Sequence, residues 1–513
     1  MKNQSPIEKK IKKRINVPPT IVSEFNIKIK EEETPPLKIP IENKIILKVA
    51  ELAQKNDFQV YIVGGYVRDY FLNRERTDLD FTVIGDALEF AKIVAKHYKT
   101  KPVLFEKFKT AMVPLKDDFQ LEFVGTRKEE YLEDSRKPIV TEGTLEDDLK
   151  RRDFTVNTLA ASLQKDKFGQ VIDLFNGFQD IKNKILKTPL DPIKTFEDDP
   201  LRMIRAARFA SQLGFNIEGK TIRAMKSMKH RLNIISIERI SAEFLKILAS
   251  PKPSIGINIL NDTELLPLFL PEISNLKGVE IKQYGEKNFA HKDVYKHSLM
   301  VLDNISIVTD NVYLRFAALL HDVGKPITKR FQPGFGWSFH GHEEVGANMI
   351  ERIFRRLKLP LENVPYVETL VRLHQRPMML VDDIITDSAI RRLAVNAGEY
   401  LQDLFTLCKA DITTKNPNLS AQYLNNYDIV LSKVLEVQEK DKLREFQSPV
   451  RGEEIMEYCK LAPCKAIGII KNNIEEAILE GIIPNEYQAA REYFEKNIDF
   501  WLSSINPKYI RRN

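Results

Sequence analysis

A glycine pair and an aspartate pair lie between apolar segments near the N-terminal end of this 513-residue chain. The apolar segment Val60–Val63 ends at Gly64 and Gly65, and a second apolar segment begins at Asp78 and Asp80. A glycine backbone approaches phosphate closely, and the N–H groups at the start of a helix attract anions. Carboxylates two residues apart on a strand point to the same face of a sheet. The pattern therefore predicts a strand, turn, helix and strand that hold a phosphate group beside two carboxylates.

Taken singly, a Gly-Gly pair is usually a turn and an Asp-x-Asp pair is usually a solvated loop end. Their combination between two strands favours metal-assisted nucleotide chemistry. Magnesium suits such a site, because it binds to one or two carboxylates together with substrate phosphates.

This segment resembles the nucleotidyltransferase superfamily, and most closely the class of tRNA CCA-adding enzymes and bacterial poly(A) polymerases. The resemblance implies that Asp78 and Asp80 are catalytic and bind two Mg²⁺ ions. It also implies that the phosphate site is shaped by Gly64, Gly65, Arg68 and Asp69.

Composition limits the broad class of protein. The length allows three or four domains, and a hydrophobic content of 43% supports real cores. Three cysteines are too few for a disulfide scaffold or a zinc site, which fits a cytoplasmic location. We expect no membrane span and no secretory signal, because no long apolar run is present and the N-terminus is rich in lysine. The net charge of +6 is compatible with a nucleic-acid partner.

Hydrophobic periodicity predicts the elements of the first part of the chain. We expect a helix over 42–57 and a helix after Asp86, which would cap it. The alternation of apolar residues over 102–115 and 119–127 predicts two paired strands. From about residue 190 onward the pattern is almost wholly helical.

Glu122 lies within the second of these strands and Arg127 follows it. An unpaired carboxylate in an apolar strand is costly, so Glu122 is either an exposed edge residue or a third carboxylate beside the aspartate pair. The resemblance favours the third carboxylate, which would activate the attacking 3′-hydroxyl or support the metals, with Arg127 nearby at the nucleotide.

The run RRDFTVN begins at Arg151. By its residues alone it is a capped helix start with a surface charge pair. It also matches the family motif that recognises the ribose, which implies nucleotide-binding roles for Arg152, Asp153 and Asn157. Further on, DLFNGFQD resembles the family's flexible loop, in which Gly177 is either a hinge or part of an ordinary turn.

The run FEDDPLRMIRAARF contains Asp199 and Arg202, which are three residues apart and would share one helix face. They form either a weak surface ion pair or an acceptor and a donor fork that read a base edge. In the family this pair selects CTP and ATP without a template, although Asp198 stands where the family has Glu. Arg205 and Arg208 on the same helix join the predicted nucleotide-binding set.

Arg239 and Glu243 match a further family motif. Their i, i+4 spacing predicts a pair that braces the helical neck.

Six of the eight histidines fall between residues 291 and 374. Imidazole and carboxylate ligands together suit Mn, Fe, Ni, Co or Zn better than Mg. This part resembles the HD phosphohydrolase superfamily, which implies a metal site and a hydrolase for phosphomonoesters or 2′,3′-cyclic phosphates, or else a vestigial or regulatory domain. By resemblance the metal ligands are His297, His321, Asp322 and Asp411, with His340, His342 and His374 at a second metal position.

Residues 451–481 resemble the helical tail of the same tRNA nucleotidyltransferases, although Cys464-Lys465 replaces the usual Gly-Pro. The alternative is a plain helical packing domain. The expected fold is α+β, with a small mixed or antiparallel sheet in the head and helical domains after it. The expected division is a flexible leader (1–40), a nucleotidyltransferase head (41–188), a helical neck for nucleotide selection (189–280), an HD domain (281–440) and a tRNA-binding tail (441–513).

The resemblance predicts an enzyme that adds or repairs the 3′-terminal CCA of tRNA from CTP and ATP. The alternatives are a poly(A) polymerase, an enzyme that adds only CC or only A, and a phosphohydrolase whose head merely binds nucleotide.

Overall fold

The computed structural model describes residues 37–75, 79–116, 119–130, 139–278, 281–284, 287–290, 293–332, 336–381, 387–414, 416–441 and 448–511. Asp78, one of the two predicted magnesium ligands, lies outside the described residues, as does most of the predicted leader. Residues 37–40, which we assigned to that leader, pack on the head: the Ile39 N–H donates to the Gly169 carbonyl, and Ile39 is buried.

The head is built on a seven-stranded mixed sheet with the strand order β3-β4-β5-β2-β1-β8-β9. Strands β2 and β5 run parallel, and the other neighbouring pairs are antiparallel. The predicted mixed sheet is therefore confirmed. Its strands are β1 (Gln59–Val63), β2 (Asp80–Ile84), β3 (Val103–Phe105), β4 (Thr110–Pro114), β5 (Gln120–Gly125), β8 (Ala160–Ser162) and β9 (Val171–Ile172).

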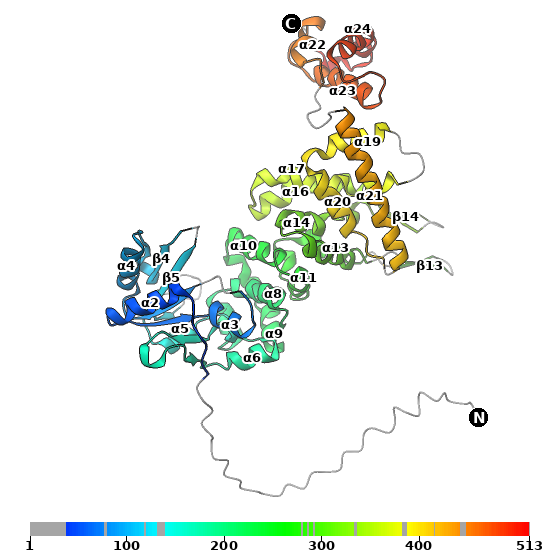
Figure 1. The fold of residues 1–513 in the computed structure, drawn as a ribbon. Coiled ribbons are helices and arrows are strands. Elements are labelled where there is room, and N and C mark those ends of the chain that lie inside the picture. Colours follow the sequence, from blue (N-terminus) through cyan, green and yellow to red (C-terminus); the bar gives the residue numbers. More distant parts are fainter. Residues whose placement is uncertain are drawn as a thin grey trace, which may run out of the picture.

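Short helices flank this sheet (Figure 1). The predicted cap is confirmed, since the Asp86 side chain accepts hydrogen bonds from two backbone N–H groups of α4. Phe81, Phe90 and Phe123 are fully buried between the sheet and α4. The head helices are α2 (Lys44–Lys55), α3 (Gly65–Phe71), α4 (Ala87–Tyr98), α5 (Leu145–Lys150) and α6 (Gly177–Asn183). Two further strands, β6 (Arg127–Glu130) and β7 (Ile139–Glu142), pair antiparallel with each other.

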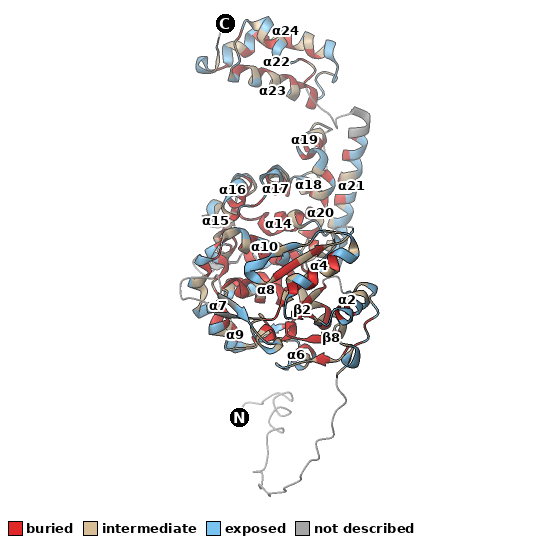
Figure 2. Cartoon of the chain, turned by 90° about the vertical axis from the view of Figure 1, so that its left-hand side faces the viewer, coloured by how far each residue is buried: buried red, intermediate tan, exposed pale blue. Residues whose placement is uncertain are grey.

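The neck is a helical layer beside the head, centred on α8, which is almost entirely buried (Figure 2). A two-stranded parallel pair, β10 (Ile185–Leu186) with β11 (Asn216–Ile217), links the two parts. The neck helices are α7 (Pro192–Asp198), α8 (Leu201–Leu213), α9 (Gly219–Ser227), α10 (Ile237–Leu248), α11 (Pro253–Asp262) and α12 (Pro271–Ser274).

The following part is helical, as predicted, apart from two hairpins that the periodicity did not predict: β12 (Ile281–Tyr284) with β13 (Lys287–Ala290), and β14 (Arg330–Gln332) with β15 (Gly336–Ser338). One hydrophobic core runs from the head through this part, from Ile39 to Val437. Its helices are α13 (Val294–Val308), α14 (Val312–Leu320), α15 (Lys325–Thr328), α16 (His342–Leu357), α17 (Val364–Leu373), α18 (Arg376–Met379), α19 (Asp387–Ala397), α20 (Leu401–Ala410) and α21 (Pro417–Asp441).

The last three helices, α22 (Gly452–Cys459), α23 (Lys465–Leu479) and α24 (Tyr487–Ser504), enclose a second core of their own. Arg392 of α19 reaches this tail and forms ion pairs with Glu476, at 2.7 Å, and Glu480. Across the described ranges, no helix is both long enough and apolar enough to cross a membrane.

Candidate active site and metal centre

A cavity of about 1000 Å³ opens between the head sheet and the neck. The residues around it come from parts of the chain more than 100 positions apart, so the fold brings together what the sequence scatters. Among its lining residues are Gly64, Gly65, Arg68, Asp80, Glu122, Arg127, Arg152, Asp153, Asn157, Asp199, Arg202, Arg205 and Arg208.

The glycine turn joins β1 to α3 at the edge of this cavity. Gly64 has a φ of +68°, and a Cβ there would lie 3.2 Å from the Arg152 guanidinium, so a side chain would be strained and crowded. Arg68, one turn into α3, donates to the Asn157 Oδ1 at 2.6 Å. Asp69 does not line the cavity; it accepts two hydrogen bonds from Arg68, both at 2.8 Å, and so orients that guanidinium.

Asp80 and Glu122 are register partners on the parallel strands β2 and β5. Burial raises the pKa of Glu122, and the charge of Asp80 raises it further. Two carboxylates that destabilise each other's charge form a donor set that suits a hard cation, so these residues fit magnesium. Arg127 approaches the same cavity from β6, where its guanidinium donates to the Phe108 carbonyl and, at 3.1 Å, to the Thr110 hydroxyl.

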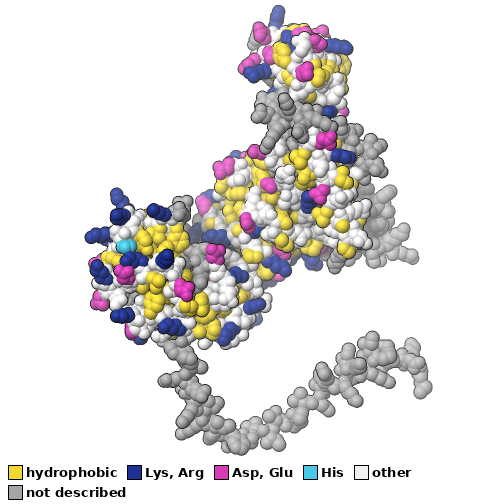
Figure 3. Space-filling model, in the orientation of Figure 1, with side chains coloured by type: hydrophobic (Ala, Val, Ile, Leu, Met, Phe, Trp, Pro, Cys, Tyr) yellow, Lys and Arg dark blue, Asp and Glu magenta, His cyan; other side chains and the backbone are white. Residues whose placement is uncertain are grey.

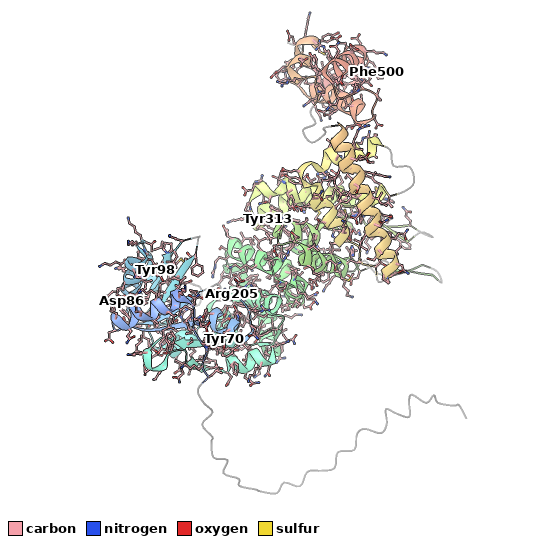
Figure 4. The ribbon with its side chains drawn as sticks, viewed as in Figure 1. Tyr70, Asp86, Tyr98, Arg205, Tyr313 and Phe500 are labelled. Atoms are coloured by element: carbon pink, nitrogen blue, oxygen red, sulfur yellow. The ribbon has the colours of Figure 1, made fainter. Side chains whose placement is uncertain are left out.

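A buried ion network ties the head to the neck at Arg205, which is labelled in Figure 4. Arg205 lies 2.6 Å from the Asp153 carboxylate and 3.9 Å from Glu243 of α10. Burial opposes the charge of Asp153, but Arg205 and the Asn157 amide outweigh it and lower the pKa of Asp153 to about 2. Burial and the neighbouring Arg205 lower the pKa of Arg208 to about 10.

The expected shared helix face of Asp199 and Arg202 is wrong. Asp199 is extended at the end of α7, and α8 begins only after Pro200. The Asp199 carboxylate accepts from the Leu201 N–H at 3.1 Å and from Arg239 at 3.2 Å. Arg202 donates to the backbone carbonyl of Arg151 at 2.6 Å. Both side chains nevertheless line the cavity.

The expected pairing of Arg239 with Glu243 is also wrong. Arg239 binds Asp199 and lines the cavity, whereas Glu243 accepts from Arg208 at 2.9 Å. The i, i+4 spacing suggested a local pair, but each residue has a partner on another segment. Sequence reasoning therefore missed Arg239 as a cavity residue, together with Lys246.

The structure bears on two local expectations. The expected helix start at Arg151 is wrong, because Arg151 ends α5 and the residues after it form a single 3₁₀ turn (Thr155–Asn157). Gly177 is fixed by close packing, since a Cβ there would lie 2.2 Å from the Thr155 carbonyl oxygen, and Asp173 accepts from its N–H at 2.8 Å. This close approach by itself requires glycine at position 177, and the hinge stays a prediction.

The second predicted site lies inside the α13–α21 part. The ligand atoms of His297, His321 and Asp411 lie within 4.8 Å of one another, as do those of His321, Asp322 and His374. His342 adjoins them, with its Nε2 3.3 Å from the Asp322 carboxylate. His340 is exposed, and the structure does not bring it into either group of described residues.

The imidazoles of this centre are oriented as metal ligands are. The Nδ1 atoms of His321, His342 and His374 lie 2.8, 2.9 and 2.6 Å from backbone carbonyls, which leaves each Nε2 directed to the centre. The Nε2 atoms of His321 and His374 and the Oδ1 of Asp322 are buried and have no hydrogen-bond partner among the described residues. Buried unsatisfied polar atoms are costly, so this donor set fits a divalent transition metal.

The histidines and aspartates of this centre shift one another's pKa values. Burial opposes the charge of His321, but Asp322 and Asp411 outweigh it and raise the pKa of His321 to about 9. Burial and the charge of His321 lower the pKa of His374 to about 4. These opposite shifts arise because the His321 and His374 rings, 5.1 Å apart, share the Asp322 and Asp411 carboxylates.

Three family models match successive parts of the chain. They are the poly A polymerase head domain over 60–187, the probable RNA and SrmB-binding site of polymerase A over 214–277, and the HD domain over 294–411. The chain is 33% identical over 361 residues to the A-adding tRNA nucleotidyltransferase of Deinococcus radiodurans, covering 69% of this chain and 79% of that protein. This chain belongs to the tRNA nucleotidyltransferase and poly(A) polymerase family.

Other members of the tRNA nucleotidyltransferase family are also similar. The multifunctional CCA protein of Shewanella frigidimarina is 34% identical over 318 residues, covering 59% of this chain and 70% of that protein. The crystal structure of the Bacillus stearothermophilus CCA-adding enzyme in complex with CTP matches with a TM-score of 0.62 at 22% identity, covering 90% of this chain and 98% of that chain. The Thermotoga maritima CCA-adding enzyme complexed with tRNA matches with a TM-score of 0.53 at 19% identity, covering 89% of this chain and 96% of that chain. At such identity these structures establish the shared fold.

Proposed function

We propose that this chain adds nucleotides from CTP and ATP to the 3′ end of tRNA and so completes or repairs the terminal CCA. The observation that carries the proposal is the single cavity in which a glycine turn, an aligned carboxylate pair and a buried arginine network meet. The names of the relatives from Shewanella and Deinococcus support tRNA as the acceptor.

Asp78 and Asp80 would hold magnesium in the head, with Glu122 beside Asp80 as the third carboxylate. Bound there, the metal would neutralise triphosphate charge and favour attack by the tRNA 3′-hydroxyl. That hydroxyl forms a bond to the α-phosphorus while the bond to pyrophosphate breaks. The raised pKa of Glu122 makes this residue a candidate to take the hydroxyl proton.

The other cavity residues would bind and orient the nucleotide. Gly64 and Gly65 leave the backbone open to phosphate, with Arg68 and Arg152 beside them as cationic donors. Asp153 and Asn157 are already joined by a 3.0 Å hydrogen bond and would face the ribose.

Base selection falls to Asp199 and Arg202. A carboxylate offers only acceptors and a guanidinium only donors, so the two together can pair with the donor and acceptor groups of cytosine or adenine. Backbone and side-chain partners fix both groups before any nucleotide binds, which suits template-free selection.

A second candidate is an enzyme that adds only the terminal A, because the A-adding relative from Deinococcus covers 69% of this chain. The test measures nucleotide incorporation on tRNA transcripts that lack the whole CCA, the final CA or only the final A. Each transcript is incubated with CTP alone, with ATP alone and with both. Our proposal predicts two C residues and one A, after which addition stops. Addition of A alone supports the second candidate, and long A-tracts on an unrelated RNA contradict both.

The HD centre would supply a separate phosphohydrolase activity. We propose that His297, His321, Asp322 and Asp411 hold a transition metal such as Mn, Ni, Co, Fe or Zn, with His342 and His374 beside them; His340 remains a predicted ligand only. Asp322→Ala should abolish metal-dependent hydrolysis of a 2′,3′-cyclic phosphate and spare nucleotide addition. Asp80→Ala should do the reverse, and one variant that abolishes both activities would contradict two separate centres.

The location we propose is the cytoplasm. All three cysteines of the chain are free thiols, which suits a reducing compartment.

A further inference from the structure

A fully buried carboxylate lies behind two of the arginines that line the nucleotide cavity, Arg151 and Arg152. Asp148 of α5 has no exposed surface and is not itself a cavity residue. Its Oδ1 accepts from the Arg151 Nε and Nη2 atoms at 3.0 and 2.5 Å. Its Oδ2 accepts from the Thr82 hydroxyl at 3.0 Å and from Arg152 at 3.3 Å. One carboxylate thus holds two adjacent guanidinium groups and one strand.

The strand that Asp148 binds is the one that carries Asp80. Thr82 is two residues after Asp80 on β2, so both side chains point to the same face of the sheet. On the other side of the network, the Arg152 guanidinium lies 3.2 Å from the Cβ position of Gly64. Asp148 therefore fixes Arg152 between the glycine turn and the strand of the candidate metal ligand.

Not every N–H group of Arg152 is used in a hydrogen bond within the protein. Its Nε atom is buried and has no hydrogen-bond partner among the residues that the structure describes. Arg152 also lines the cavity with its side chain 18% exposed, so the accessible part of its guanidinium can donate to a phosphate or ribose oxygen there. The guanidinium is therefore placed for a ligand and not consumed by the fold.

The same anchor reaches the base-reading side of the cavity. Asp148 holds the Arg151 side chain, and the carbonyl of Arg151 accepts from Arg202 at 2.6 Å. A shift of the turn at Arg151 would move Arg202 and Arg152 together.

We propose that Asp148 is a positioning residue that presents Arg152 to the nucleotide phosphates and steadies Arg202 at the base. This inference rests on the proposed function. A purely stabilising role is a weak account of the arrangement, because the desolvation of a buried ion pair largely offsets its attraction. Without Asp148, the adjacent charges of Arg151 and Arg152 would repel each other and leave their present places.

The decisive variant is Asp148→Asn in the full chain, which preserves the shape of the side chain and removes its charge. We expect the KM for both CTP and ATP to rise roughly tenfold or more, since a charge-assisted contact to the nucleotide is lost. Asp147→Asn is the matched control: the Asp147 side chain is partly exposed and caps α5 through Thr144, and only its backbone carbonyl, which the substitution keeps, meets Arg151. It should lower the melting temperature and leave both KM values unchanged.

A double-mutant cycle separates positioning from stability. In an Arg152→Lys background, Asp148→Asn should raise KM less than about threefold, because the guanidinium it orients is already gone. Equal effects in both backgrounds would overturn the proposal, as would Asp148→Asn with a wild-type KM and a lowered melting temperature. If Asp148→Asn does not fold, Thr82→Val is used in its place. It removes the hydroxyl that donates to Asp148 and should raise the KM for nucleotide about threefold. An unchanged KM in Thr82→Val would also overturn the proposal. Wild-type protein that incorporates no nucleotide would instead refute the proposed function.

Discussion

The contact between Asp153 and Arg205 should be one of the strongest links between the head and the neck. Asp153 is 7% exposed, and its pKa falls from an ordinary 3.8 to about 2 in the folded protein. A shift of that size corresponds to about 2 kcal/mol of interaction that favours the ionised carboxylate. Arg205 supplies the largest favourable part of it, so we expect a coupling of about 1–2 kcal/mol between the two residues.

The perturbation is a double-mutant cycle of Asp153→Asn and Arg205→Gln. Both tryptophans, Trp337 and Trp501, lie outside the head and neck, so intrinsic fluorescence would report on other parts of the chain. Hydrogen–deuterium exchange of peptides from α8 reports directly on opening at this contact. The exposed pair Glu351 and Arg355 on α16, 2.5 Å apart, is the control and should couple by only a few tenths of a kcal/mol.

The pH dependence of the coupling free energy between Asp153 and Arg205 tests the direction of this pKa shift. Because the folded pKa of Asp153 is lowered, its stabilisation is fully present above about pH 4 and is lost as the pH falls toward 2. The coupling should therefore be constant from neutral pH to about pH 4 and shrink below it. A coupling no larger than that of the control pair, or one that grows as the pH falls, would refute the reasoning.

Three further outcomes follow from the two centres. Glu122→Gln should raise the melting temperature of the metal-free protein while nucleotide addition is lost, because burial and Asp80 disfavour the Glu122 charge; a fall in both would contradict this. Gly324→Ala places a Cβ 2.1 Å from the His342 carbonyl oxygen, so hydrolysis should fall at least tenfold with nucleotide addition retained, and unchanged hydrolysis would count against the packing. Mn²⁺ or Ni²⁺ at about 100 times its Kd should stabilise the wild type by about 3 kcal/mol in thermal unfolding and leave Asp322→Asn unmoved; an equal shift in both would place the metal elsewhere.

The local signals in the sequence predicted the framework of the head well. The cap at Asp86 and the paired strands over 102–115 and 119–127 depend on near neighbours, and the structure has them, with a short 3₁₀ turn (Glu106–Phe108) between β3 and β4. The alignment of Glu122 with Asp80 depends on which strands pair, and no local pattern specifies that.

The misses have one physical cause. Helical spacing suggested local partners for Asp199, Arg239 and Glu243. Pro200 interrupts the helix between Asp199 and Arg202, so those two residues do not share a face. Arg239 and Glu243 instead bind residues of other segments, Asp199 and Arg208. Asp148 carried a usable signal, since Arg151 and Arg152 follow it at i+3 and i+4, the spacing at which helical side chains meet.

The surface of the head adds a feature that no local pattern gives. Lysine and arginine side chains are spread over the head on the face seen in Figure 3. Acidic side chains lie among them in Figure 3. Lysine and arginine contacts to a nucleic-acid backbone would weaken as the salt concentration rises.

The most direct test of the central claim is nucleotide addition at single-residue resolution. Wild-type protein is incubated with a tRNA transcript that lacks CCA, with both CTP and ATP, beside the Asp80→Ala variant. We predict that the wild type extends the tRNA by C, C and A and then stops, and that Asp80→Ala adds nothing while its HD hydrolysis persists. Full extension by Asp80→Ala, or no extension by the wild type, would contradict the assignment of the head cavity as the nucleotidyl-transfer site.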